Sequence, residues 1–275
     1  MAELDYNPMN RAKNNEKENP ASYFRQYREQ LGFTNQKTAK DYLGGKEITP
    51  GIDFDYIDQL NHRLAQIIQK INNIAHPSYR HHAIDSFCLS CIEEPYSKIK
   101  QSGLLPKLNN QGRRPEEVLF SWLRGYCISQ RFTPVFSKIF RVDLHAISEI
   151  GDDDWKNPAT FKRSPKADLA MHMEGKKIRI EVQSGFQGIN DIKEHKVREA
   201  RNIYKTLGES SICIHIDVFN GQVAFVPLDT IEENDVHFVT RQQMEGQSVF
   251  TIDQNYFKWR LLDPIPSREL LELSL

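Results

Sequence analysis

Apolar residues recur at helical spacing through the first part of the chain. The clearest stripe has apolar side chains three and four positions apart and consists of Ile57, Leu60, Leu64, Ile67, Ile68, Ile71 and Ile74. A second run holds Ile84, Phe87, Cys88, Cys91 and Ile92 and is limited by Pro95. Because this spacing places the apolar residues on one face of a helix, residues 21–112 are predicted to form a helical region.

From residue 113 onward, the pattern predicts mixed α and β structure. The expected elements are a helix that starts at Pro115 and ends near Gln130, a strand near residues 142–148, strands at 166–173 and 177–184, a helix at 189–207, and two strands joined by Asn220-Gly221. Asn-Gly is the sequence that a two-residue type I′ hairpin turn favours. The order helix, three strands, helix and further strands predicts an α/β fold over residues 113–275.

The two strands at 166–184 alternate strictly between apolar and polar residues. Apolar Leu169 and Ile180 alternate with polar Asp168 and Glu181. With Glu174-Gly175 as a two-residue turn, paired residue numbers sum to 349, so Asp168 lies opposite Glu181; a four-residue turn would place Asp168 opposite Gln183 on the same face. A slip by one residue would turn one apolar set to the wrong side, and the pattern forbids it.

Two opposed carboxylates need a compensating charge. Directly opposed side chains lie ~5 Å apart, and at an effective dielectric constant of about 20 their repulsion is roughly 3 kcal/mol. A divalent cation offsets it, and Mg²⁺ sites commonly use one or two carboxylates. The alternative is that Arg179 or Lys177, on the same face, neutralises the acids in surface ion pairs.

A glutamate near the start of the helix at Pro115 is also directed inward. On a helical wheel, Glu116 falls within the apolar arc, whereas Glu117 lies on the polar side. An inward carboxylate needs a partner because an unpaired buried charge is costly. The alternative is that both acids favour the positive end of the helix dipole.

Composition and charge narrow the classes of protein. The 36 basic and 37 acidic side chains give a net charge of -1, which argues against a generic polycation but allows a local basic surface. Residues 1–20 have no apolar core and are expected to be a solvated arm rather than a signal peptide. No segment has the apolar length of a membrane span. Four cysteines are too few for a disulfide scaffold, so a cytoplasmic setting is expected.

Two further motifs have ordinary structural explanations. Cys88 and Cys91 form one C-x-x-C on an apolar helical stripe, without a second pair to complete a zinc site, so they are interpreted as core residues. Residues 24–45 have the outline of a helix-turn-helix, with Thr34 capping a second helix that carries Lys37 and Lys40. A scaffold hairpin of two helices is the favoured interpretation of this segment.

Glu116 (or Glu117), Asp168 and Glu181-Val182-Gln183, in this element order, resemble the PD-(D/E)xK nuclease superfamily, which includes most Type II restriction endonucleases. The resemblance covers about residues 113–228. It departs from the family pattern at two points: Ala167 precedes Asp168, with Pro165 further upstream, and Gln183 occupies the position of the usual lysine. Some restriction endonucleases, and competence-associated nuclease-like proteins, carry E-x-Q there.

The resemblance implies a restriction-endonuclease-like core, a central mixed sheet flanked by helices, over residues 113–275. It also implies Mg²⁺-dependent phosphodiester hydrolysis. Asp168, Glu181 and the main-chain carbonyl of Val182 would bind Mg²⁺, and Glu116 would join them as a catalytic residue. Gln183 would orient the attacking water, and Lys166, Arg179 or Lys193 would replace the missing lysine charge.

The expected function is therefore that of a Type II restriction endonuclease, a homodimer acting on double-stranded DNA. Residues 21–112 would contact DNA or mediate dimerisation, and the residues expected to contact DNA are Lys193, Lys196, Arg198, Lys37 and Lys40. The alternatives are a repair or competence nuclease of the same superfamily, a catalytically silent DNA-binding protein, and an ion-paired hairpin in an unrelated α+β protein.

Overall fold

The computed structural model describes residues 20–45, 47–108, 113–150, 167–232, 236–241 and 246–273. Residues 1–19 of the expected solvated arm and Lys166 therefore lie outside the described residues. The α-helices are α1 (Pro20–Gln30), α2 (Gln36–Leu43), α3 (Phe54–Ile74), α4 (Ile84–Cys88), α5 (Glu94–Ser102), α6 (Pro115–Phe140) and α7 (Glu194–Leu207). The strands are β1 (Ile147–Glu149), β2 (Leu169–Met173), β3 (Lys176–Gly185), β4 (Asp191–Lys193), β5 (Ser210–Asp217), β6 (Gln222–Pro227), β7 (Val239–Arg241), β8 (Gln247–Thr251) and β9 (Phe257–Arg260).

The fold is mixed α/β, with a central mixed sheet flanked by helices, as the sequence predicts. The six-stranded sheet has the order β1-β2-β3-β5-β6-β9. Only β3 and β5 run parallel within it, and α7 connects them, whereas the other neighbouring pairs are antiparallel. A parallel pair needs such a crossover connection, so α7 is brought back across one face of the sheet.

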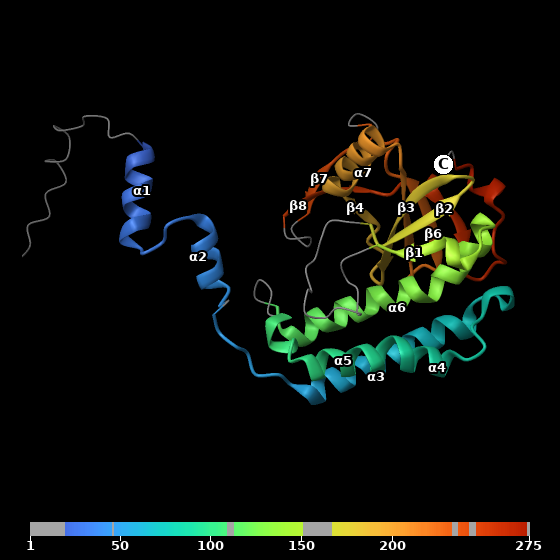
Figure 1. Ribbon diagram of the computed structural model, residues 1–275, viewed down its shortest axis with the longest axis horizontal. Coiled ribbons are helices and arrows are strands. Elements are labelled where there is room, and N and C mark those ends of the chain that lie inside the picture. Colours follow the sequence, from blue (N-terminus) through green and yellow to red (C-terminus); the bar gives the residue numbers. More distant parts are fainter. Residues whose placement is uncertain are drawn as a thin grey trace, which may run out of the picture.

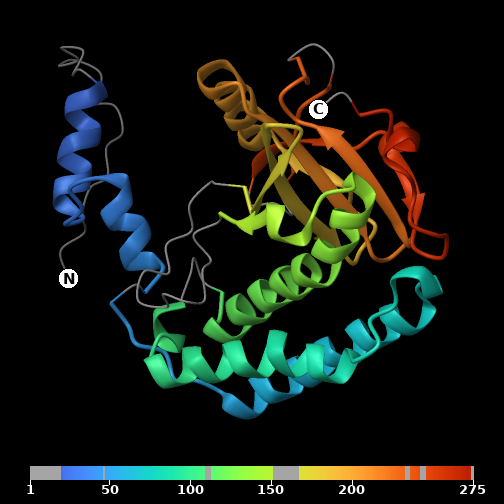
Figure 2. The same cartoon turned by 45° about the vertical axis from the view of Figure 1, so that its right-hand side comes forward.

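Helix α6 covers the other face of this sheet. Figures 1 and 2 show α6 between the sheet and the layer formed by α3, α4 and α5. One hydrophobic core runs through these layers, from Ile57 and Leu64 of α3, through Leu123 of α6, to Ile180 and Ile214 of the sheet. The helical region thus shares its core with the α/β part.

Helix α6 is longer than the sequence pattern predicts. It continues past Gln130 to Phe140 with Pro134 inside it. A proline removes one intrahelical hydrogen bond and usually ends or kinks a helix. Here the apolar face continues beyond it with the fully buried Val135, Phe136 and Ile139, and burial of these side chains favours the longer helix.

The second face carries a smaller sheet and α7. The small sheet has the order β4-β8-β7, and a second hydrophobic core joins it to α7 through Ile192, Val197 and Phe250. The prediction of a continuous helix from residue 189 is wrong at its start. Residues 191–193 form β4, and the helix begins at Glu194, because Ile192 pairs with β8, a partner far away in sequence.

The hairpin of β2 and β3 has the predicted register. Leu169 pairs with Ile180 and Met173 with Lys176, so paired numbers sum to 349. Glu174 and Gly175 form the turn with φ angles of 52° and 78°, the two positive values that a type I′ turn requires. The four-residue alternative for this turn is excluded.

The turn between β5 and β6 differs from the prediction. Asp217 pairs with Gln222, so the loop has four residues, and within it only Gly221 has a positive φ, of 68°. The Asp217 carboxylate accepts hydrogen bonds from the backbone N–H and the side-chain amide of Asn220. This local capping favours the longer loop over the two-residue type I′ turn.

Helices α1 and α2 lie apart from the rest of the molecule in both ribbon views (Figures 1 and 2). The aromatic residues Tyr23, Phe24 and Tyr27 of α1 contact one another but are more than half exposed. Asn35, rather than the expected Thr34, caps α2, through a capping box with Thr38. The hairpin of helices contributes to neither hydrophobic core.

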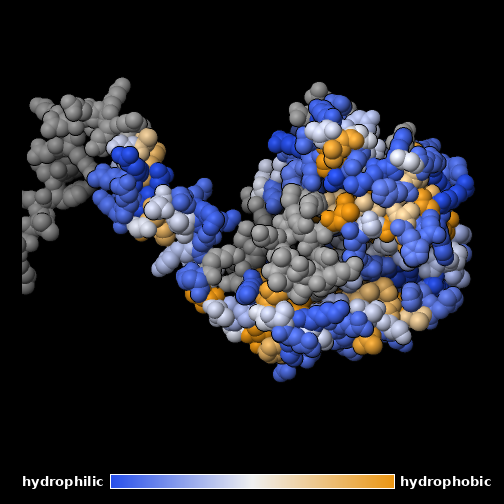
Figure 3. All heavy atoms as spheres, in the orientation of Figure 1, coloured by the Kyte–Doolittle hydropathy of each residue, from blue (hydrophilic) through white to orange (hydrophobic). Residues whose placement is uncertain are grey.

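On the face shown in Figure 3, apolar side chains form separate spots among polar ones. Such scattered exposure is ordinary for a folded protein. Among the helices of the described residues, none has the length and apolar character needed to cross a membrane.

Candidate active site

The β2–β3 hairpin brings Asp168 and Glu181 together. Asp168 directly precedes β2, and its carboxylate Oδ2 accepts a hydrogen bond of 2.7 Å from the backbone N–H of Val182. Because Leu169 pairs with Ile180, Asp168 and Glu181 are the next opposed pair along the hairpin, on one face of the sheet. One oxygen of Asp168 is therefore fixed by the strand that carries Glu181.

Burial and the neighbouring carboxylate strongly perturb Glu181. Desolvation, followed by the charge of Asp168, raises the pKa of Glu181 to about 7, although Lys196 acts in the opposite direction. The predicted repulsion between the two acids is thus present in the fold. A carboxyl group whose pKa lies near neutrality, beside a second acid, is typical of functional sites.

Lys196 of α7 provides the positive charge next to this pair. Its Nζ lies 2.9 Å from Oε2 of Glu181, and both side chains are only 20% exposed. Burial lowers the pKa of Lys196, but the Glu181 carboxylate outweighs burial, so the net shift is upward and the lysine is held as a cation. Lys196 therefore lies largely buried beside Glu181, and its expected contact with DNA stays a prediction.

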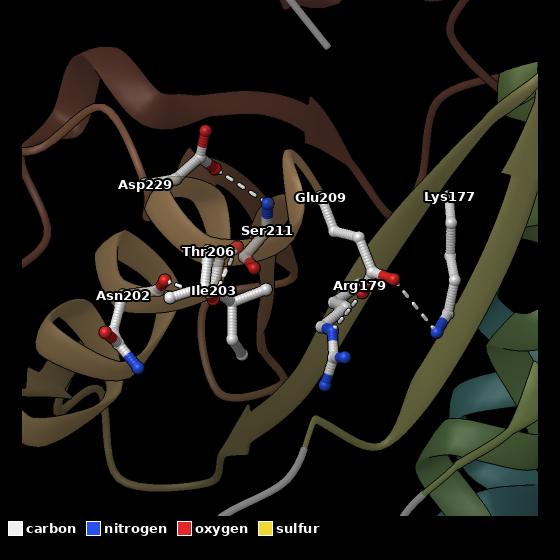
Figure 4. Close-up of polar contacts among 8 residues, drawn as sticks. All are labelled: Lys177, Arg179, Asn202, Ile203, Thr206, Glu209, Ser211 and Asp229. Carbon is white, nitrogen blue, oxygen red and sulfur yellow. Dashed lines mark hydrogen bonds and ion pairs between the residues drawn. The ribbon is translucent and has the colours of Figure 1, made fainter.

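Arg179 and Lys177 do not pair with the two acids. Figure 4 shows both directed to Glu209, which follows α7 and precedes β5. The distances from Glu209 are 2.7 Å to Nε of Arg179 and 3.2 Å to Nζ of Lys177. Burial opposes ionisation of Glu209, but these two cations outweigh it and lower its pKa. The alternative in which Arg179 or Lys177 neutralises Asp168 and Glu181 is therefore wrong.

Gln183 is engaged on the side of the small sheet. Its side-chain amide donates a hydrogen bond of 2.8 Å to the main-chain carbonyl of Asp191 in β4. Its Oε1 accepts a weak contact of 3.7 Å from the buried Cys213 thiol. Gln183 thus joins β3 to β4, and its expected role in orienting water stays a prediction.

Glu116 is buried, as predicted, and has partners on the helical side. It is 1% exposed, and its Oε1 accepts hydrogen bonds of 2.8 Å from the backbone N–H of Asp53 and 3.1 Å from Arg114. Burial opposes ionisation, but these donors outweigh it and lower the pKa of Glu116. These contacts tie α6 to the start of α3. Glu117 is exposed.

The other residues expected to contact DNA lie in three places. Lys193 ends β4 and is half-buried, and Arg198 of α7 is exposed and pairs with Glu194. Lys37 pairs with Asp41 on the separate α2, where Lys40 is also exposed. Their contact with DNA stays a prediction, and the structure does not gather them into one cluster.

A cavity of about 230 Å³ opens beside Asp168, between the sheet and α6. Its walls include Val182, Trp122 and Tyr126, together with Glu149 of β1, which accepts a hydrogen bond from Gln130. Sequence reasoning did not identify Glu149 as a neighbour of Asp168. The only sequence signal was the apolar Ile147 two positions before it, because strand pairing brings Glu149 opposite Leu169.

The donor set is suited to Mg²⁺ with a small number of protein ligands. Within the described residues, no group of three or more His, Cys, Asp or Glu side chains is placed to share a metal ion. Asp168 and Glu181 supply two carboxylates, and Mg²⁺ commonly uses one or two, with water and substrate phosphate completing its shell. Burial and, after it, the charge of Asp168 raise the pKa of Glu181, and a cation would relieve the repulsion between the two acids. The residues therefore fit Mg²⁺.

Comparison with known proteins gives a limited result. No family model matches the chain, and no curated protein matches it. Among solved structures, it is similar to Hjc, a Holliday junction resolvase from the archaeal hyperthermophile Archaeoglobus fulgidus, with 12% identity and a TM-score of 0.30, over 47% of this chain and 83% of the resolvase. A likeness at this level assigns no activity, and function must come from the site itself.

Proposed function

We propose that the protein is a Mg²⁺-dependent endonuclease that hydrolyses phosphodiester bonds of double-stranded DNA. The observation that carries this proposal is the opposed pair of Asp168 and Glu181 on one hairpin, in the register that the sequence predicts. Its resemblance to the PD-(D/E)xK motif, on the expected strands and after the expected helix, supports the same conclusion.

Asp168, Glu181 and Val182 of the hairpin have defined parts in the proposed reaction, and so does Lys196 of α7. Asp168, oriented by the N–H of Val182, and Glu181 hold the metal, together with the main-chain carbonyl of Val182. When bound, Mg²⁺ supplies Lewis acidity to the scissile phosphate and lowers the pKa of a water molecule. Lys196 keeps a positive charge beside Glu181, which favours the close approach of a phosphate.

The more specific form of the proposal is a Type II restriction endonuclease acting as a homodimer. Palindromic DNA sites invite two-fold symmetric proteins. Helices α1 and α2 carry Lys37 and Lys40 and stand apart from the catalytic part (Figure 2), which leaves them accessible to DNA or to a second subunit. A repair or competence nuclease would share the chemistry and lack the sequence specificity.

The test is incubation of the purified protein with plasmid and phage DNA, with Mg²⁺ and with EDTA, beside an Asp168→Asn/Glu181→Gln variant. These substitutions keep the shape of the side chains and remove both charges. We expect discrete Mg²⁺-dependent fragments, and a cleavage rate lower by about 10³-fold or more in the variant. A smear would favour the repair or competence nuclease. DNA left intact, with binding in a gel-shift, would favour a silent DNA-binding protein.

A further inference from the structure

Position 183 lacks the positive charge of the family motif. A lysine usually stands two residues after the motif glutamate, and this chain has Gln183 there. The Gln183 amide donates to the carbonyl of Asp191, so this side chain supplies packing between β3 and β4 rather than charge. The hairpin itself therefore offers no cation beside Glu181 at this position.

Of the three cations expected as substitutes, Lys166 lies outside the described residues, and neither Arg179 nor Lys193 forms an ion pair with Glu181 there. Arg179 is held by Glu209 at 2.7 Å, and Lys193 lies at the end of β4, where the chain enters α7. Lys196 is the cation whose Nζ reaches Glu181, at 2.9 Å. This ion pair is four-fifths buried on both sides, which separates it from the exposed pairs of α7, such as Arg198 with Glu194.

The helix places Lys196 on the face that packs against the sheet. Val197 and Ala200 of α7 are buried in the second core, and Lys196 lies one helical turn before Ala200, on the same side. Strand β4 anchors the start of the helix by pairing with β8. Glu181, Lys196 and Ala200 line a hollow of about 20 Å³, room for roughly one water-sized group.

We propose that Lys196, supplied by α7, replaces the motif lysine as the positive charge beside Glu181 and positions this carboxylate for the nuclease reaction. This inference rests on the proposed function. Lys196 acts through Glu181 and is therefore a positioning residue. Its ammonium and a metal ion compete for the same carboxylate, so the lysine opposes metal binding while it assists the reaction.

The test compares Lys196→Met, which keeps the length of the side chain without its charge, with the double variant Gln183→Lys/Lys196→Met. Lys205→Met is the matched control, because Lys205 is an exposed lysine of the same helix. The measurements are single-turnover DNA cleavage with Mg²⁺, DNA binding with Ca²⁺, Mn²⁺ binding by the free protein, and urea unfolding.

We expect Lys196→Met to lower the maximal cleavage rate by about 10²-fold, with DNA affinity changed by less than about threefold. Mn²⁺ should bind this variant more tightly, by about threefold or more, because a competing cation is gone. The double variant should recover at least about tenfold in rate, since it returns the charge to the strand. A purely structural lysine would give neither the tighter metal binding nor the recovery.

Two failures are distinguishable. An active wild-type protein whose Lys196→Met variant cuts as fast as Lys205→Met would overturn this inference alone. Slower cutting by Lys196→Met with unchanged or weaker Mn²⁺ binding, and no recovery in the double variant, would overturn it as well. A wild-type protein that leaves DNA intact under all conditions would overturn the proposed function, and the role of Lys196 with it.

Discussion

The two faces of the central sheet are equally buried but chemically different. Strand β5 shows this most clearly, because its successive residues point to opposite faces. Ile212, Ile214 and Ile216 face α6 and are fully buried, and the residues between them, Cys213 and His215, face the side of α7 and are also no more than 1% exposed. One strand thus contributes aliphatic packing to one face and polar chemistry to the other.

The polar face is organised by specific partners. Asn190 lies 2.8 Å from Nε2 of His215 and donates to Asp217, and Lys196 pairs with Glu181. A buried polar group is costly when it lacks a partner, so these side chains must be held in defined positions. The α6 face of the sheet thus contributes to stability by burying large aliphatic side chains. The α7 face holds polar side chains in fixed positions, as a functional site requires.

The largest expected effect on stability comes from the aliphatic face. Ile214→Ala removes buried methyl groups next to α6 and should lower the free energy of unfolding by about 2–5 kcal/mol. The loss should be the same at every pH, because no titrating group is involved. Urea unfolding measures it, with Ile214→Val as the conservative control, expected at about 0.5–1.5 kcal/mol. A loss below about 1 kcal/mol for Ile214→Ala would show that the face collapses around the cavity.

The sequence predicts the local features of this region and misses those that depend on distant segments. Alternation along β2 and β3 predicts the hairpin, its turn and the opposed Asp168 and Glu181, because all of these depend on neighbouring residues. Strand β4 and the partner of Glu181 depend on contacts between distant segments. Lys196 has the same sequence signature as a solvent-exposed lysine, and only the packing of α7 against the sheet brings it to Glu181.

The end of α6 illustrates the same limit. The helix expected to end near Gln130 continues past Pro134 to Phe140, and Phe136 and Phe140 in this added part are buried. A proline inside a helix costs about 3 kcal/mol or more, and burial of the two aromatic side chains offsets this cost. The local sequence of a helix does not show which of its residues will pack against distant segments.

The contribution of the polar face to the free energy of unfolding should depend on pH, whereas that of the aliphatic face should not. Burial lowers the pKa of His215 to about 4, against the opposing charges of Asp217 and Asp191. Between pH 6.5 and 4 the folded state therefore binds fewer protons than the unfolded state, so stability falls as the pH falls through this range. The loss amounts to at most about 3 kcal/mol.

His215→Gln tests this difference between the faces. Glutamine keeps a polar side chain next to Asn190 and does not titrate. The difference in unfolding free energy between wild type and variant should shrink from pH 7.5 to pH 4.5, whereas the difference for Ile214→Ala should stay constant. Parallel pH profiles for wild type and His215→Gln, measured by urea unfolding, would contradict the assignment of the pH dependence to His215.

Glu116 is a buried charged residue of α6, the helix that covers the aliphatic face. Its substitution is expected to change the free energy of unfolding least. Its pKa is lowered by the N–H of Asp53 and by Arg114, which together outweigh burial. A carboxylate with a lowered pKa stabilises the fold above its ordinary pKa and loses this contribution as the pH falls through the lowered value. Glu116→Gln keeps an acceptor for Asp53 and loses the charge, so we expect a loss of about 1 kcal/mol at pH 7 that disappears as the pH falls below the lowered pKa of Glu116.

The same variant separates the two roles of Glu116. If its contacts with α3 define its role, the DNA cleavage rate of the folded Glu116→Gln protein should stay within about threefold of wild type, and the exposed Glu117→Gln should change neither rate nor stability. A large loss of cleavage with unchanged unfolding would instead support the catalytic role that the motif predicts. The distinction matters because Oε1 of the buried Glu116 carboxylate already has an N–H donor and an arginine, whereas Glu181 faces a second acid.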